Sequence, residues 1–152
     1  MEREAGFTLL EMICILAIVA LLAALILPAL PRATSRPRLE AYALQAASIL
    51  SADRNAAIRT KAAVATALNP NARTIRSGAN GGSMQLPSDV AFDAVLARQC
   101  NGRSGGERIE FFPSGMSCGG TIGISRSGAG FQVRVNWLTG GVEVVALDLP
   151  AK

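Results

Sequence analysis

The chain has 152 residues and contains no histidine, and its only lysines are Lys61 and Lys152. Histidine is the most common general base in enzymes and a frequent zinc ligand, so its absence removes most acid–base arrangements and most zinc sites. No motif around either lysine supports a serine–lysine dyad. The sequence therefore predicts no catalytic residue and no metal site.

Phosphate-binding loops are also missing, although the chain is rich in glycine. Neither a dinucleotide-binding fingerprint nor a loop ending in Gly-Lys-Ser/Thr is present. The glycine pairs at 81–82, 105–106, 119–120 and 140–141 are interpreted as turns. We accordingly expect no cofactor and no enzymatic activity. The formal net charge of +4 permits an anionic partner but does not demonstrate one.

What the chain does contain is one long apolar run near its amino terminus. Residues 12–31 carry no charge over 20 positions. A helix of that length rises about 30 Å, the thickness of the hydrocarbon core of a membrane. Glu11 stands at the entrance of this run. An ionisable side chain at the edge of a membrane helix costs free energy unless it has a partner, so Glu11 is predicted to be functional.

Two other interpretations of this run remain open. A secretory signal peptide has a basic start and an apolar region of about 7–15 residues, whereas this run is longer and follows a segment that is not basic. An ordinary single-pass anchor explains the length but not the glycine and phenylalanine that precede Glu11. The arginine distribution argues for a cytoplasmic carboxyl-terminal part, because Arg32, Arg36 and Arg38 follow the run and only Arg3 precedes it.

The segment Gly6-Phe7-Thr8-Leu9-Leu10-Glu11-Met12-Ile13 resembles the amino terminus of a type IV pilin-like precursor. In that family a peptidase cleaves after the glycine, the new terminal phenylalanine is N-methylated, and the glutamate takes part in filament assembly. The resemblance implies cleavage between Gly6 and Phe7, N-methylation of Phe7, and an assembly role for Glu11. We let this resemblance override the arginine distribution when orienting the chain in the membrane.

The same resemblance organises the first part of the chain into a leader at residues 1–6 and a transmembrane helix at 7–31. Proline removes a backbone donor and clashes with the preceding turn, so a helix kink is expected at Pro28. Two more prolines, Pro31 and Pro37, are expected to interrupt the helix there too. An amphipathic continuation is predicted at 32–61, because apolar residues recur at steps of three and four. These residues are Leu39, Tyr42, Ala43, Ala46, Ile49 and Leu50.

Alternating apolar and polar residues predict strands in the last third of the chain. The clearest period of two runs from Phe131 to Trp137, and shorter alternations cover 108–112, 121–125 and 142–144. Glycine-rich turns at 128–130 and 139–141 separate the later runs, so an antiparallel meander is expected. Weaker strand candidates are 62–68 and 84–96. The predicted fold class is α+β and pilin-like, a long amino-terminal helix packed on a small antiparallel β-domain at 62–152.

Three cysteines are present: Cys14 within the apolar run, and Cys100 and Cys118 on either side of the strand at 108–112. A disulfide between Cys100 and Cys118 is predicted if this part of the chain lies in an oxidising compartment. Two free thiols remain the alternative, because a sequence does not show whether the two β-carbons approach each other. Two cysteines without histidine do not predict a zinc site.

Two further segments, 111–122 and Val135-Asn136-Trp137-Leu138-Thr139-Gly140, resemble the end of the type II secretion minor pseudopilin H family. That family has a phenylalanine-rich strand, a Pro-x-Gly turn, a Gly-Gly step and a Leu-Thr-Gly turn before its last strand. The resemblance covers about the first 50 residues and the last 45. It implies a non-enzymatic subunit near the tip of a periplasmic pseudopilus, which supports export of folded proteins across the outer membrane.

The partners that the resemblance implies are a prepilin peptidase, the major and other minor pseudopilins, and the inner-membrane secretion platform. The implied location is the bacterial inner membrane, crossed once, with the carboxyl-terminal domain in the periplasm.

The alternative function is a minor type IV pilin of a DNA-uptake or pilus system that binds DNA. Such a protein needs clustered lysine or arginine to displace counterions from phosphates. Gly141 stands where many relatives carry arginine, and residues 142–152 contain two acids and one lysine. Arg126 and Arg134 are separated along the chain and are interpreted as solvated surface. Nucleic acid is therefore not the expected partner.

Overall fold

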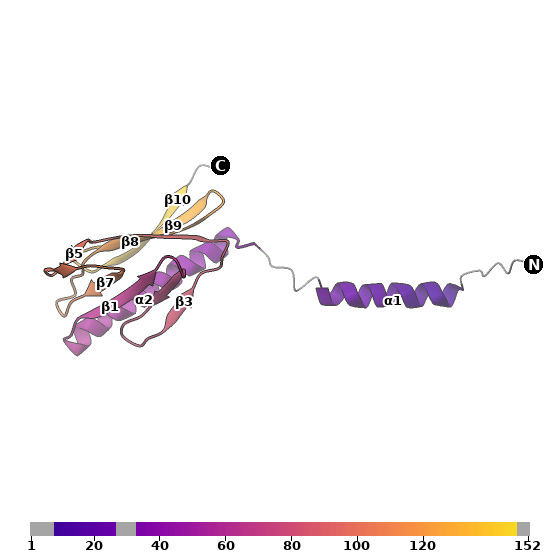
Figure 1. Cartoon of the computed structure of the whole chain (residues 1–152), viewed down its shortest axis with the longest axis horizontal. Coiled ribbons are helices and arrows are strands. Elements are labelled where there is room, and N and C mark those ends of the chain that lie inside the picture. The colour runs from indigo at the N-terminus through magenta and orange to yellow at the C-terminus, as the bar shows by residue number, and fades with distance from the viewer. Residues whose placement is uncertain (1–7, 27–32, 149–152) are drawn as a thin grey trace, which may run out of the picture. The chain divides into compact units, whose positions relative to one another are not determined.

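The computed structural model describes residues 8–26 and 33–148 and divides the chain into two compact units, Met1–Ala33 and Thr34–Lys152 (Figure 1). The first unit contains helix α1 (Leu9–Ile26), and the second contains helix α2 (Arg36–Thr60) with all of the strands. The predicted leader and Pro28 lie outside the described residues, as do the two ends of the predicted transmembrane helix.

Helix α1 is apolar on every face that the structure describes, and Glu11 is the acidic residue of its first turn. Within this unit the described side chains of the helix are exposed. None of the helices in the described part of the chain is long and apolar enough to cross a membrane.

Helix α2 lies within the predicted amphipathic segment, residues 32–61, and begins at Arg36. Ser35 precedes the helix with an extended backbone, and Pro37 lies in its first turn. Proline is tolerated there because the first amide groups of a helix have no partner within it. Pro37 therefore does not interrupt α2, contrary to the prediction. The helix ends where Lys61 takes a left-handed conformation.

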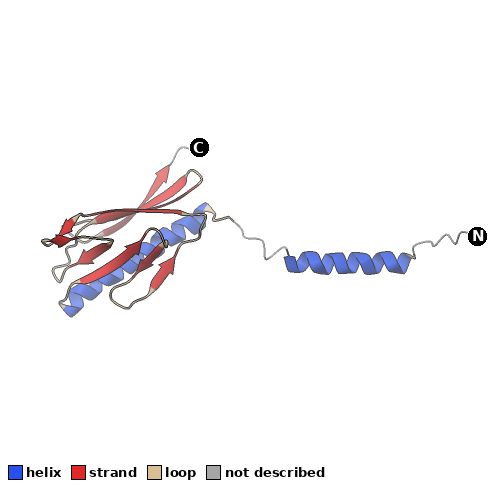
Figure 2. Ribbon diagram, in the orientation of Figure 1, coloured by secondary structure: helices blue, strands red, loops and turns tan. Residues whose placement is uncertain are grey.

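The strands form two four-stranded antiparallel sheets and one small hairpin (Figure 2). In the β1 sheet the order is β3-β2-β1-β7, with β1 (Val64–Asn69), β2 (Thr74–Arg76), β3 (Ser83–Gln85) and β7 (Arg108–Phe111). In the β9 sheet the order is β10-β9-β8-β4, with β4 (Ala91–Leu96), β8 (Gly120–Arg126), β9 (Ala129–Val135) and β10 (Val142–Asp148). The hairpin pairs β5 (Gln99–Cys100) with β6 (Arg103–Ser104).

The core lies where α2 packs against both sheets. Leu39 and Leu50 of α2 are almost completely buried, and burial of each such side chain contributes about 1.5–3 kcal/mol. The strands contribute the inward members of their alternating patterns, which are Leu68, Ile75, Met84, Ile109, Phe111, Ile122, Ile124, Phe131, Val133 and Val135. Opposite residues of the same strands face solvent, as the period of two predicts.

The predicted meander is right for β8, β9 and β10 but wrong for the strand at 108–112. That strand is β7, and it pairs with β1 instead of β8. The turn after Phe111 and the positive φ angles of Gly115, Gly119 and Gly120 redirect the chain between the two sheets. The predicted strand from Phe131 to Trp137 is also too long. Strand β9 ends at Val135, and Trp137 lies in the following turn with 62% of its surface exposed.

Candidate functional site

The first turn of α1 holds Glu11, the predicted assembly residue, close to Thr8. The amide of Glu11 donates to the carbonyl oxygen of Thr8 at 3.1 Å and to its Oγ1 at 3.3 Å. Thr8 thus caps the helix, and Thr-x-x-Glu is the sequence of a capping box. The side chain of Glu11 is exposed, and the amino-terminal end of a helix favours its negative charge. Gly6 and Phe7, the predicted processing residues, lie outside the described residues.

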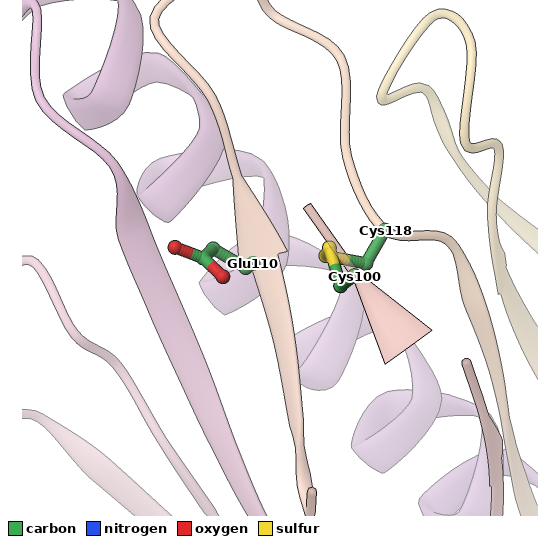
Figure 3. A group of neighbouring side chains, drawn as sticks. All are labelled: Cys100, Glu110 and Cys118. Carbon is green, nitrogen blue, oxygen red and sulfur yellow. A yellow bond between two sulfur atoms is a disulfide. The ribbon is translucent and has the colours of Figure 1, made fainter. Parts of the chain in front are cut away.

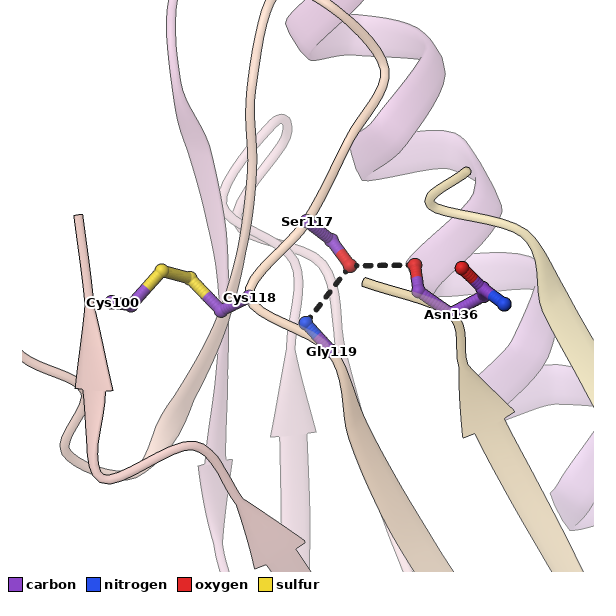
Figure 4. The surroundings of a disulfide bond; sticks show 5 residues. All are labelled: Cys100, Ser117, Cys118, Gly119 and Asn136. Atoms are coloured by element: carbon purple, nitrogen blue, oxygen red, sulfur yellow. Dashed lines mark hydrogen bonds between the residues drawn. A yellow bond between two sulfur atoms is a disulfide. The ribbon is translucent and has the colours of Figure 1, made fainter. Parts of the chain in front are cut away.

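The predicted disulfide between Cys100 and Cys118 is present. It joins β5 to the loop before β8, with 5.5 Å between the two Cα atoms (Figure 4). The β5–β6 hairpin belongs to neither large sheet, so the bond holds this excursion of the chain to the rest of the domain. Cys14 of α1 is free and exposed.

Glu110 lies near the disulfide, on β7, which separates the two cysteines in the sequence (Figure 3). A carboxylate oxygen of Glu110 and the two sulfur atoms lie within 4.8 Å of one another. Metal ions are bound by thiolates, not by sulfur atoms already bonded to each other. The three side chains could therefore hold a metal ion only after reduction, and the oxidised domain offers only the carboxylate.

A second group of contacts fixes the turn between β9 and β10. The Ser117 hydroxyl donates to the carbonyl oxygen of Asn136 at 3.1 Å and accepts from the amide of Gly119 at 3.0 Å (Figure 4). The amide of Ser117 donates to the carbonyl oxygen of Trp137. The disulfide loop and the exposed Trp137 are thereby held together. A hollow of about 410 Å³ lies between them.

Helix α2 supports the same end of the domain through Arg54. Its Nε donates to the carbonyl oxygen of Gly115 at 3.1 Å. Gly140, at a φ of +61°, packs so close to that carbonyl and to Arg54 that a β-carbon would collide with both. Glycine at position 140 is therefore required by its backbone conformation and by the close contact. The predicted Leu-Thr-Gly turn is confirmed as a turn that packs on α2.

The most buried polar cluster, around Asp53 of α2, was not predicted. Its carboxylate is fully buried and accepts hydrogen bonds from the hydroxyls of Thr66 and Ser77 and from the amides of Gly78 (3.0 Å) and Ala79 (3.1 Å). A buried charge is tolerated when such donors replace water. The signal was in the sequence, because Asp53 continues the apolar steps that run through Ala46 and Leu50.

A second unpredicted cluster holds the chain where it enters the domain. Thr34 donates to the carboxylate of Asp89 through its amide at 2.8 Å and through its hydroxyl at 3.0 Å. Arg126 forms an ion pair with Asp89 at 3.0 Å and donates to the carbonyl oxygen of Thr34. The Thr34 amide, and then the Thr34 hydroxyl and Arg126, lower the pKa of Asp89 below its ordinary value, against the opposing effect of desolvation. Local sequence carries no signal for this cluster, because its members are distant along the chain.

Comparisons with known proteins decide the family. Residues 1–27 match the model of the prokaryotic N-terminal methylation motif. The chain is 32% identical over 147 residues to the type II secretion system protein H of Xanthomonas campestris pv. campestris, covering 96% of this chain and 86% of that protein. The chain belongs to the type II secretion system protein H family.

Solved structures agree with this family in fold. The minor pseudopilin EpsH of Vibrio cholerae superposes with a TM-score of 0.55 at 14% identity, covering 70% of this chain and 95% of that one. The type IV minor pilin FimU of Pseudomonas aeruginosa gives 0.55 at 15% identity, covering 76% and 97%. The pilin-like fold is thus confirmed. Because a secretion protein and a pilus protein match equally well, the fold does not distinguish their functions.

In the present chain, the predicted site residues fall into two regions. Cys100 and Cys118 are brought together at one end of the domain. Glu11 lies on α1 in the other unit, and the roles of Gly6, Phe7, Glu11 and Pro28 remain predictions.

Proposed function

We propose that this protein H family member is a structural subunit near the tip of a periplasmic pseudopilus that supports the export of folded proteins. The observation that carries the proposal is the likeness to type II secretion system protein H, which extends over 96% of the chain. It includes the domain as well as the shared amino-terminal motif. A pilus protein that binds DNA is not favoured by any contact in the described residues.

Processing and membrane insertion follow from the amino-terminal motif. A prepilin peptidase would cleave after Gly6, whose missing side chain lets the backbone lie extended in an active site. Phe7 would then become the N-methylated terminus of a helix that spans the inner membrane once, with the domain in the periplasm. The match of residues 1–27 to the methylation motif supports this step.

Assembly would depend on the exposed carboxylate of Glu11. Cleavage frees the amine of Phe7 at the start of the helix, where the helix dipole already concentrates positive charge. In low dielectric a carboxylate needs such a partner, and we propose that the pair forms between neighbouring subunits of the filament. Neighbouring pseudopilins and the inner-membrane platform are therefore the partners we propose.

The domain would act as a rigid, non-catalytic head. The Cys100–Cys118 disulfide and the Asp53 cluster each tie segments far apart in the sequence. Rigid elements suit a subunit that transmits force and presents fixed surfaces to its neighbours. The proposed function does not require this chain to catalyse a reaction.

Deletion of the gene in its own bacterium tests the proposal. We expect proteins exported by the type II pathway to accumulate in the periplasm, while the frequency of DNA uptake stays at the parental level. The wild-type gene should restore export, and Gly6→Leu should leave an uncleaved precursor that does not. Normal export together with reduced DNA uptake would favour the pilus alternative and overturn the proposal.

A further inference from the structure

The outer face of the β1 sheet places two arginines on either side of an alanine. Strand β1 turns Thr66 and Leu68 inward and leaves Ala67 exposed. Ala67 pairs with Arg76 of β2 on one side and with Arg108 of β7 on the other. Paired residues point to the same face of a sheet, so the two arginines flank the small methyl group of Ala67.

This arrangement forms a hollow of about 630 Å³ on the sheet. Ala65 and Ala67 of β1 line it together with both arginines, so alanine side chains lie between the arginines and form its floor. The remaining polar lining consists of Asn69, Thr74 and Glu107. Neighbouring strands are about 4.8 Å apart, so the Cα atoms of the two arginines lie about 10 Å apart, within reach of one bound group.

Neither guanidinium is used inside the described part of the protein. Other arginines of the domain have partners there: Arg54 bonds a carbonyl, Arg126 pairs with Asp89, and Arg134 donates to a glutamine. Among the described residues, the side chains of Arg76 and Arg108 have neither a hydrogen bond nor an ion pair, although Glu107 lines the same hollow. Their donor capacity is therefore available to a ligand.

We propose that this hollow, the Arg76–Arg108 slot, binds a carboxylate side chain presented by an acidic segment of another protein. Guanidinium groups match carboxylates in shape and charge and bind them through paired hydrogen bonds. The alanine floor leaves room for the incoming side chain between them. The use of this slot in the pseudopilus depends on the proposed function, whereas the binding itself does not.

Nearby acids favour a protein carboxylate over a nucleic acid. Glu107 lines the slot just before β7 begins, and Glu110 lies on β7, paired with Ala65. A nucleic-acid backbone carries closely spaced phosphates, which these carboxylates would repel. A segment with one or two acidic side chains can place them at the arginines and leave neutral backbone beside the glutamates.

A peptide titration tests the slot on the full chain in detergent micelles at low ionic strength. The probe is a fluorescein-labelled peptide, Gly-Ser-Glu-Ser-Glu-Ser-Gly, and the control is its glutamine counterpart with the same label, which lacks the two side-chain carboxylates; both are followed by fluorescence anisotropy. We expect the acidic peptide to bind and the glutamine peptide to bind at least tenfold more weakly. Arg76→Gln or Arg108→Gln should weaken binding of the acidic peptide about tenfold, the loss expected for one charge-assisted pair.

Matched variants separate the slot from general charge. Arg134→Gln removes one positive charge from the outer face of the β9 sheet and should leave binding unchanged. Ala67→Leu should weaken binding by filling the floor, whereas Ala91→Leu, on an exposed position of β4, should not. Retained circular dichroism and unfolding temperature will show that each variant is folded.

The proposal is overturned if the acidic peptide does not bind, if Arg134→Gln weakens binding as much as Arg76→Gln, or if Ala67→Leu has no effect. It is also overturned if a single-stranded oligonucleotide or an anionic phospholipid vesicle binds through these arginines more tightly than the peptide. A failed titration with normal loss of export on gene deletion would reject the slot and leave the proposed function standing.

Discussion

Each of the two helices carries one carboxylate among apolar residues, but one carboxylate is exposed and the other is buried. Glu11 of α1 is exposed, and the contact that the structure describes for it is through its backbone amide, to Thr8. Asp53 of α2 is fully buried and receives four hydrogen bonds from its own domain. An apolar segment can thus hold a carboxylate for a partner outside the chain or for donors within it. We propose that the first use serves assembly, whereas the hydrogen bonds to Asp53 stabilise the domain.

The largest effect is expected for Glu11→Ala, which removes a carboxylate that has no side-chain partner among the described residues. The variant should be processed and should keep the unfolding free energy of the domain, because Glu11 belongs to the separate unit Met1–Ala33. Its crosslinking to neighbouring pseudopilins should fall more than tenfold, measured in membranes after export is induced. Glu40→Ala on the exposed face of α2 is the control. Unchanged crosslinking would contradict the proposed role of Glu11 in assembly.

Asp53→Ala should have the opposite profile, with loss of stability as the primary effect. It leaves two hydroxyls and two amides near α2 without an acceptor, and we expect the unfolding free energy to fall by about 3–5 kcal/mol. Urea unfolding followed by Trp137 fluorescence measures this change. Glu40→Ala should stay within about 0.5 kcal/mol of the wild type. Equal stability of the two variants would show that the buried cluster contributes nothing.

Removing the disulfide tests the covalent link within the domain, which joins two cysteines with a sequence separation of 18. The Cys100→Ser, Cys118→Ser double variant should lose about 3 kcal/mol, because the unfolded chain regains the entropy of an open loop. Cys14→Ser should lose nothing from the domain. Before reduction, thiol alkylation of membranes should label only Cys14. Free reaction of Cys100 and Cys118 would place the domain in a reducing compartment.

The smallest effect concerns Asp89, which is partly exposed and whose pKa is lowered by the Thr34 amide, the Thr34 hydroxyl and Arg126. A lowered folded pKa stabilises the domain above the ordinary aspartate pKa of about 3.9, and this contribution is lost as the pH falls through the folded value. Urea unfolding from pH 6 to pH 2 should therefore show less pH dependence in Asp89→Asn than in the wild type. Asp93→Asn controls for loss of a surface carboxylate. Identical profiles for wild type and Asp89→Asn would contradict the assignment.

Local patterns determined much of this protein from sequence alone. The motif around Gly6, Phe7 and Glu11 indicates the family, and the period of α2 gives its buried face, because both depend on residues close together in the chain. Alternation located β8, β9 and β10 for the same reason. The Leu-Thr-Gly turn followed from its glycine.

Only the tertiary structure decided which distant segments meet. The pairing of β7 with β1, the donors around Asp53, the approach of Cys100 to Cys118, and the contact of Arg126 with Thr34 all join positions far apart in sequence. A period of two says which side of a strand is buried but not which strand lies beside it. Partners across a sheet or between loops depend on the register that the whole domain adopts, so no local pattern specifies them.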